Sequence, residues 1–195
     1  MNEQIPHIIE RVDGVDRSFD IYSRLLTNRM IFLTGEIEDG KSNILIAQIL
    51  YLDASDPNKD IIMFINSPGG VVTAGLALYD VMQYVKCDIR TICIGQASSM
   101  GAILLGAGKK GKRLAFPNSR IMLHQPIGGM EGVVSDIEIH AREILRYRQR
   151  LNEILASCTG QSLDVISRDT ERDFFMDAQE ALKYGVIDAI AENRS

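Results

Sequence analysis

The sequence predicts an α/β fold in which a mainly parallel sheet is covered by helices. Two short runs, 61–65 (IIMFI) and 91–94 (TICI), consist of apolar and β-branched residues, as is typical of strands buried on both faces of a parallel sheet. Each run is followed by small residues and then by a stretch with helical spacing, so that strand and helix alternate along the chain. This alternation favours right-handed βαβ crossovers within one domain.

Composition limits the classes of function. The chain has 195 residues, of which 46% are hydrophobic, enough for one domain with a sizeable core. Its net charge of −5 and the lack of a long basic block argue against nucleic acid as a partner. The apolar runs are too short to span a membrane, and we expect no secretory leader. Three widely spaced cysteines suit neither a disulfide framework nor a zinc site, which favours the reducing cytoplasm.

The first half of the chain predicts an arm followed by alternating helices and strands. Residues 1–18 lack clear periodicity, and we expect a mobile or partner-dependent arm there. A short amphipathic helix, capped by Ser18, should follow at 19–26. The remaining predicted elements are a strand at 30–33, a helix at 41–52, a strand at 61–65, a helix at 71–85 and a strand at 88–94.

The turn at 66–70 (NSPGG) could bind a ligand. Pro68 fixes one φ angle, and the two glycines permit backbone geometry that is closed to other residues. Free N–H groups would then lie at the carboxyl end of a strand, where α/β folds bind ligands. The alternative is a plain connection between a strand and a helix.

A second turn carries Ser99 between a strand and a helix. Residues 95–98 break the strand, and uncharged small and apolar residues follow Ser99, as suits a tightly packed helix. A serine on such a sharp turn, with Ala97 and Gly101 on either side, is typical of a nucleophile elbow. Unpaired N–H groups at the helix start could stabilise an oxyanion. The alternative is that Ser98 or Ser99 only caps the helix.

The second half predicts a long helix among shorter elements. These are a basic loop at 109–112, a strand at 120–123, a long helix at 134–157, a helix at 162–170, an extended segment at 172–176, a helix at 177–184 and a strand at 186–190. Ser135 and Glu138 form a potential capping box for the long helix, while Asp177 and Gly185 bound the last helix. The long helix should reach roughly 34 Å, at 1.5 Å per residue, and extend beyond the domain.

A base and an acidic partner can be sought for Ser99. The sequence has three histidines: His7, His124 and His140. His124 is the best placed as a base because it ends an apolar strand, whereas the others lie in the arm and in a charged helix. A purely structural histidine is the alternative. The carboxylates that could orient the ring are Asp169, Asp173 and Asp177. Asp173 stands apart because the apolar run 174–176 follows it and borders buried structure.

Six stretches of the chain resemble the Clp protease proteolytic subunit family of serine peptidases. They are SFDIYSRLL, IFLTGEIED, FINSPGGVVTAGLALYD, ICIGQASSMGAILL, GKRLAFPNSRIMLHQPIGG and RDTERDFFMDAQEALKYGVID. Together they span about residues 5–190 in the family's order, which is far more specific than one G-x-S-x-G. The resemblance implies a ClpP/crotonase-like α/β fold of repeated β-β-α units. It divides the chain into an N-terminal axial arm at 1–18 and one peptidase domain at 19–195, with a handle at about 125–158.

The resemblance also implies roles for single residues. Ser99 would be the nucleophile, His124 the general base and acid, and Asp173 the third member of a catalytic triad. The backbone N–H groups of Gly70 and Met100 would form the oxyanion hole, which agrees with the two turns described above.

An assembly and partners are implied as well. Family members form two heptameric rings stacked into a closed barrel, joined here through the long helix from Val134 and the glycines at 128–129. The arm would be the axial gate. Hexameric AAA+ unfoldases of the Clp type would dock in hydrophobic clefts, for which the candidate lining residues are Ile62, Phe64 and Tyr84. The family often has tyrosines where Ile62 and Phe64 stand, so the strength of docking is open.

The expected substrates are unfolded polypeptides, cut to short peptides inside the barrel. No cofactor is expected on this chain, because ATP is used by the partner unfoldase and the sequence lacks a G-x-x-x-x-G-K-[ST] motif. At most about four residues precede Ile5 and Pro6, from which we expect little or no processing.

Two other classes of function share parts of this pattern. A non-catalytic ring subunit would shape a mixed barrel with a paralogue, and it would be inert toward small peptides even when assembled; such relatives typically lose a triad residue, which this chain does not. A crotonase-type acyl-CoA enzyme shares a similar fold and an oxyanion hole made of two N–H groups. It needs no serine–histidine pair, and tight acyl-CoA binding would identify it.

Overall fold

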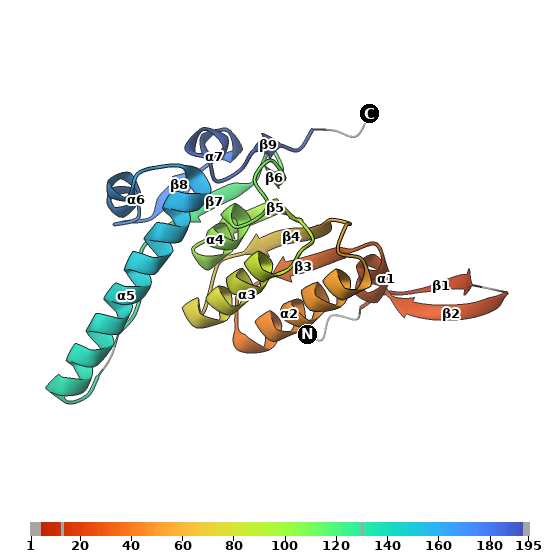
Figure 1. Cartoon of the computed structure of the whole chain (residues 1–195), viewed down its shortest axis with the longest axis horizontal. Coiled ribbons are helices and arrows are strands. Elements are labelled where there is room, and N and C mark those ends of the chain that lie inside the picture. The colour runs from red at the N-terminus through yellow and green to blue at the C-terminus, as the bar shows by residue number, and fades with distance from the viewer. Residues whose placement is uncertain (1–4, 13, 130, 193–195) are drawn as a thin grey trace.

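The computed structural model describes residues 5–12, 14–129 and 131–192 (Figure 1). Its elements in chain order are β1 (His7–Val12), β2 (Val15–Asp20), α1 (Ile21–Thr27), β3 (Met30–Thr34), α2 (Asp39–Ser55), β4 (Ile61–Ser67), α3 (Val72–Tyr84), β5 (Ile89–Ser98), α4 (Met100–Gly106), β6 (Arg113–Ala115), β7 (Arg120–Leu123), α5 (Val134–Thr159), α6 (Leu163–Asp169), β8 (Phe174–Met176), α7 (Ala178–Tyr184) and β9 (Ala189–Ile190).

The main sheet of the described residues has seven strands: β7 and β8 branch from β5, and the other five lie in the spatial order β3-β4-β5-β6-β9. These strands are parallel, as is β7, which pairs with the second half of β5. Only β8, on the far side of β7, runs antiparallel to its neighbour. The mainly parallel α/β fold predicted from the alternating pattern is therefore confirmed.

The core lies between the sheet and helices α2, α3 and α4, which gather on one face (Figure 1). Along β4 the side chains alternate, and Ile61, Met63 and Ile65 are fully buried. Leucine and isoleucine side chains of α2 and α3 join the same core, and every residue of α4 is buried. Full burial of one large apolar side chain contributes about 1.5–3 kcal/mol. This layer therefore fixes β4 and β5, whose carboxyl ends carry the candidate site.

Strand β5 is longer than predicted because it bends rather than ends at Gly95. The first half pairs with β6, up to Cys93, and the second half pairs with β7 from Gln96 to Ser98. Gly95 has φ 74°, a left-handed conformation that glycine adopts without strain. The expectation that residues 95–98 break the strand was thus wrong. As a result β5 spans two neighbours in succession and ends directly before Ser99.

Strand β6 was not predicted, and β9 is shorter than the predicted strand at 186–190. The N–H of Val186 bonds to the Ala181 carbonyl, 3.1 Å away, and so completes the end of α7 rather than a strand. A buried ion pair explains why β6 and β9 adjoin. The side chain of Arg113 is only 3% exposed, and its guanidinium nitrogen lies 2.6 Å from Asp188 Oδ1. Because the two residues are far apart in the sequence, local periodicity could not predict this pair.

The N-terminal arm contains an antiparallel hairpin of β1 and β2, which extends away from the sheet (Figure 1). Its second strand runs through Phe19 and Asp20, so the expected helix at 19–26 begins only at Ile21. Asp20, not Ser18, caps it, and its Oδ1 accepts the N–H of Ser23 at 2.9 Å. The predicted start of the helix was wrong because residues 19 and 20 belong to strand β2.

Helix α5 comprises 26 residues and is buried only near its C-terminal end, while the other end stands clear of the sheet (Figure 1). It begins at Val134, with Val133 as a cap residue that makes no side-chain hydrogen bond. The capping box expected from Ser135 and Glu138 was therefore wrong, because Ser135 already lies within the first turn. Asp177 and Glu180 do form a capping box at α7, and Gly185 ends that helix as predicted.

Candidate active site

Ser99 occupies a strained turn between β5 and α4. Its backbone has φ 54° and ψ −124°, and among the described non-glycine residues only Arg29 also has a positive φ. Such a conformation costs about 1–3 kcal/mol and persists only where the surroundings enforce it. Here the Ser99 N–H donates to the Met122 carbonyl at 2.8 Å, and its own carbonyl accepts from Ala102. The side chain makes no capping hydrogen bond, so the helix-cap interpretation is not supported.

Glycines allow the chain to approach this serine closely. A Cβ on Gly69 would lie 2.7 Å from Ser99 Cβ and 3.2 Å from Ser99 Oγ, and Gly69 also has φ +100°. Gly101, in the first turn of α4, packs on the end of β4, where a Cβ would lie 3.2 Å from the Ser67 carbonyl oxygen. The loop after β4 therefore rests directly against the nucleophile elbow.

A second segment, residues 34–38, holds that loop from behind. The N–H of Ile37 donates to the Gly69 carbonyl at 2.8 Å, and the N–H of Val71 donates to the Ile37 carbonyl at 2.8 Å. These two bonds make an isolated parallel bridge between Ile37 and Gly70. A Cβ on Gly70 would collide with the main chain of Ile37, so only glycine fits. The sequence did not predict a role for Ile37, because the residue acts through its main-chain N–H and carbonyl, and these do not depend on the identity of the side chain.

Two backbone N–H groups beside Ser99 have no acceptor within the described residues. They belong to Gly70, in the loop that packs on Ser99, and to Met100, which follows Ser99 in the chain. In a parallel bridge the middle residue points its own N–H away from its partner, so the Gly70 N–H faces away from Ile37. N–H groups in the interior are nearly always paired, and two unpaired ones from neighbouring turns suit an anionic oxygen.

His124 and Asp173 meet across the antiparallel pair of β7 and β8. His124 follows the last residue of β7, Asp173 precedes the first residue of β8, and Leu123 pairs with Phe174. The ring Nδ1 lies 3.1 Å from Asp173 Oδ1, with side-chain exposures of 15% and 58%. A main-chain hydrogen bond beside this pair also joins the two segments: the N–H of Gln125 donates to the Thr170 carbonyl at 2.7 Å. A ring held in this way keeps Nε2 for another partner.

Ser99 and His124 follow the carboxyl ends of adjacent strands. Ser98 of β5 is level with Met122 of β7, so each of the two residues lies just beyond this pairing. No hydrogen bond joins Ser99 Oγ to the ring in the part of the chain described. Such contacts are often long without substrate and shorten in the Michaelis complex. The arrangement brings a serine, a histidine, a carboxylate and two N–H donors to one edge of the sheet.

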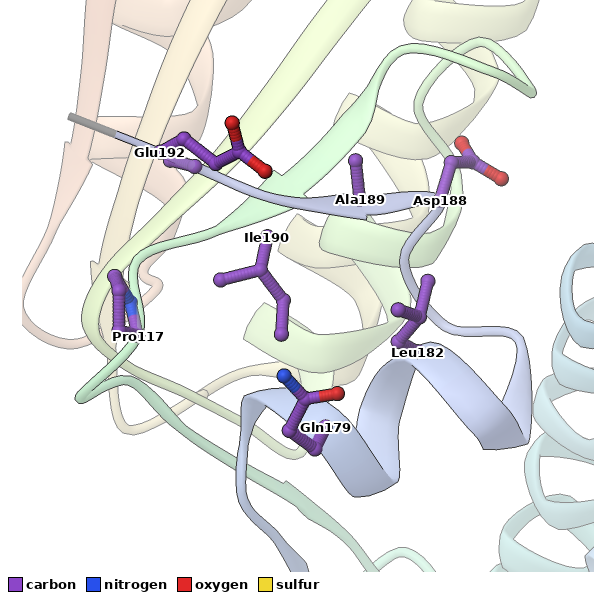
Figure 2. Close-up of a pocket in the computed structure, with 8 residues that line it drawn as sticks. Pro117, Gln179, Leu182, Asp188, Ala189, Ile190 and Glu192 are labelled. Carbon is purple, nitrogen blue, oxygen red and sulfur yellow. The ribbon is translucent and has the colours of Figure 1, made fainter. Parts of the chain in front are cut away.

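A hollow of about 450 Å³ adjoins the histidine–aspartate pair. It is lined by His124, Gln125, Ile127, Glu171, Arg172 and Asp173. A larger hollow, of about 660 Å³, lies elsewhere, between α7, β9 and the turn at Pro117. Figure 2 shows Gln179, Leu182 and Ile190 around it, with the carboxylates of Asp188 and Glu192 but without a serine, a cysteine or a histidine. The smaller hollow is thus bordered by the histidine and the aspartate, whereas Ser99 is not among the residues that line it.

The other acidic candidates serve local structure. Asp169 accepts hydrogen bonds from Tyr184 at 3.1 Å and from Arg168 at 2.9 Å, and Asp177 caps α7. Of the three, only Asp173 reaches the ring of His124. The other histidines are far from Ser99 along the fold: His7 lies in the hairpin, and His140 is on the exposed part of α5.

The residues proposed for a partner cleft lie on different layers of this chain. Ile62 and Phe64 alternate with the core residues of β4, so they lie on the opposite, partly open face. There Phe64 stacks on Phe32, with ring centroids 5.2 Å apart. Tyr84 ends α3 on the helical face and is 81% exposed.

The cysteines offer no competing nucleophile. Burial raises the pKa of Cys93 to about 11. Burial and the neighbouring Asp53 carboxylate likewise raise the pKa of Cys87 to about 11. Burial also raises the pKa of Cys158. Within the described residues, no group of three or more metal-binding side chains forms a site, and no helix has the length and apolar character to cross a membrane.

Comparison with known families agrees with this geometry. A family model described as Clp protease matches residues 13–194, nearly the whole chain. The mainly parallel sheet with its covering helices is consistent with that family's fold. The chain therefore belongs to the Clp protease family, and its activity is that of a peptidase.

Proposed function

We propose that this chain is a serine endopeptidase that degrades unfolded proteins to short peptides inside a barrel-shaped chamber. The strained Ser99 beside two unpaired N–H groups is the observation that carries the proposal. A serine used only for packing or capping would gain nothing from this conformation. Strain of this kind concentrates at functional sites, where it presents a side chain for reaction.

Each reacting group has a defined part in the proposed reaction. Ser99 Oγ attacks the substrate carbonyl while His124 Nε2 takes its proton, and Asp173 holds the ring in the required tautomer. The N–H groups of Gly70 and Met100 stabilise the negative oxygen of the tetrahedral intermediate. His124 then gives the proton to the leaving amine. Water, activated by the same ring, releases the acyl group from Ser99 and restores the enzyme.

The chamber is proposed to form from two stacked heptameric rings of this chain. Exposed apolar side chains on the protruding part of α5 and the segment before it support a contact between copies: Ile127, Val133, Val134, Ile137, Ile139 and Leu145. A monomer seldom exposes so many apolar groups on one projection. The N-terminal hairpin would then be the axial gate.

A hexameric AAA+ unfoldase of the Clp type is the proposed partner, which uses ATP and feeds unfolded chains into the barrel for protein quality control. The open face with Ile62 and Phe64, joined by Tyr84 of a neighbouring copy, would form the docking cleft. Free cysteines in every described position fit the reducing cytoplasm as its compartment.

Labelling with a fluorophosphonate tests the proposed chemistry. The reagent should modify Ser99 alone, as located by mass spectrometry, and His124→Ala should abolish the modification. Ser99→Ala should lose peptide cleavage while the assembly stays intact. Labelling at another residue, or near-normal turnover by Ser99→Ala, would refute the assignment.

A further inference from the structure

The segment between β3 and α2 runs alongside the loop that carries Gly70. Besides the two bonds of the bridge at Ile37, the N–H of Gly35 donates to the Asn66 carbonyl at 2.9 Å. Three main-chain hydrogen bonds thus connect residues 34–38 with residues 66–71. The position of residues 66–71 therefore depends on that of residues 34–38.

Lys41 holds residues 34–38 in place from the first turns of α2. Its Nζ donates to the carbonyl oxygens of Thr34, at 2.6 Å, and Glu36, at 2.7 Å. Gly35 lies between them with φ +69°, and a Cβ there would come within 3.3 Å of Nζ. Lys41 forms no ion pair with a described carboxylate, so its charge is directed at the two carbonyls. Hydrogen bonds from a charged donor are roughly twice as strong as neutral ones.

Because Ile37 and Gly70 form a bridge, the position of residues 34–38 also determines the direction in which the Gly70 N–H points. Its main chain is held on one side by Ile37, and the collision that a Cβ would cause shows how little space separates them. A rotation of the bridge would turn the Gly70 N–H away from the place where the oxyanion forms. A misplacement of about 1 Å can cost about 10²-fold in rate.

We propose that Lys41 is a positioning residue for the oxyanion-binding N–H of Gly70 and acts through Ile37. The inference rests on the proposed function, because it assigns the Gly70 N–H to the oxyanion. Lys41 itself touches neither substrate nor reacting atoms. Its contribution appears in the transition state, where the oxyanion carries charge, more than in substrate binding.

The test compares Lys41→Met with Lys41→Arg and with Lys59→Met as a matched control. Lys59 pairs with Asp56 on the surface, where its side chain is 72% exposed, rather than with the carbonyl groups of residues 34–38. With a small peptide substrate, Lys41→Met should lower kcat about 10- to 100-fold and change KM less than twofold. Affinity for a peptide aldehyde, whose adduct with Ser99 places an oxyanion in the site, should fall by a similar factor. Lys41→Arg keeps charged donors and should recover most of the loss.

Amide hydrogen exchange gives a readout that does not require activity. Lys41→Met should speed exchange at Gly35, Ile37 and Val71, and Lys59→Met should not. If Lys41→Met fails to assemble, Lys41→Gln, which keeps a neutral donor, is measured in the same way.

The outcomes separate the two proposals. Wild-type kcat in Lys41→Met, unchanged exchange at Ile37 and Val71, or an equal loss in Lys41→Arg overturns the positioning role, even in an active enzyme. An inert wild-type chain that no fluorophosphonate labels overturns the proposed function instead, while hydrogen exchange still decides whether Lys41 holds the loop.

Discussion

His124 Nδ1 lies 3.1 Å from Asp173 Oδ1, and the two residues reach each other only because β7 and β8 pair antiparallel. The aspartate is more than half exposed, so its value for global stability is small. What the contact does determine is which ring nitrogen carries the proton, and it leaves Nε2 for another partner.

Replacing Asp173 by Asn should therefore affect catalysis far more than folding. We expect kcat/KM for a small peptide to fall about 10²- to 10⁴-fold, because the amide favours the wrong tautomer. Asp164→Asn, in the first turn of α6, is the control and should keep normal activity. Equal activities of the two variants would remove Asp173 from the triad.

Ser99 should be replaceable by glycine with a gain in stability. Ser99→Gly and Ser99→Ala both lose the nucleophile, but only glycine adopts the observed backbone without strain. Thermal unfolding of the two variants at equal protein concentration should show Ser99→Gly more stable by about 1 kcal/mol. A less stable glycine variant would mean that the turn is not strained in solution.

Gly70 should tolerate no side chain, whereas Gly40 should accept one. Gly70→Ala would force the main chain away from Ile37, and loss of one oxyanion donor typically costs about 10²- to 10³-fold in kcat. Gly40→Ala, in α2, is the matched control, because a Cβ there meets no atom within 4 Å. That variant should be more stable by about 0.5–1 kcal/mol and fully active. Comparable kcat values for both would exclude Gly70 from the oxyanion hole.

Thiol reagents should leave the native enzyme active. Burial raises the pKa of Cys93 to about 11, so almost no thiolate is present at neutral pH. Iodoacetamide at pH 7.5 should therefore alkylate the folded protein slowly and all three cysteines rapidly in urea, as counted by mass spectrometry. Rapid loss of peptidase activity under native conditions would point to a reactive cysteine instead.

The Arg113–Asp188 pair should make the stability of the chain depend on acid pH. Burial by itself would raise the pKa of Asp188, but hydrogen bonds from Arg113 outweigh it and hold the pKa below its ordinary value of 3.8. A lowered pKa in the folded state means that the stabilisation is present above pH 3.8 and disappears as pH falls through the folded value.

Thermal unfolding between pH 3 and 7 can measure this contribution. Asp188→Asn leaves Arg113 buried and unpaired, which should cost about 3–5 kcal/mol at neutral pH and flatten the acid limb of the curve. The exposed pair of Asp56 and Lys59 supplies the control, since Asp56→Asn should change stability by less than about 1 kcal/mol. An unaltered acid limb in Asp188→Asn would assign the acid sensitivity to other carboxylates.

The sequence predicts those parts of the site that depend on local chemistry. Ser99 is recognisable because small residues flank it between a strand and a helix, and His124 because it ends an apolar strand. The choice of Asp173 over Asp169 could not be made from spacing, since it depends on which strand β8 pairs with. The apolar run 174–176 and the resemblance to a family both favoured Asp173, and among the three acidic candidates it is the one whose carboxylate reaches the ring of His124.

The features that the sequence did not predict depend on main-chain interactions. Ile37 reads as one more apolar residue, yet its N–H and carbonyl hold the loop of Gly70. The bend at Gly95 was taken for a strand end, because a glycine in a strand signals either a break or a bulge. In the N-terminal hairpin the apolar pairs Ile8–Phe19 and Val12–Val15 share one face with the charged pair Glu10–Arg17, and these charges interrupt the apolar alternation by which a strand is predicted.

The pairing of β7 with β8 also orders events as the chain folds. The turn at Ser99 forms from residues adjacent in sequence, whereas 49 positions separate His124 from Asp173. Closing so long a loop costs more entropy than forming a local turn, and contacts between distant segments form later. If Ser99, His124 and Asp173 act as proposed, a chain whose C-terminal segment has not yet docked would have the serine in its turn but no oriented base, and it would not yet cleave peptides.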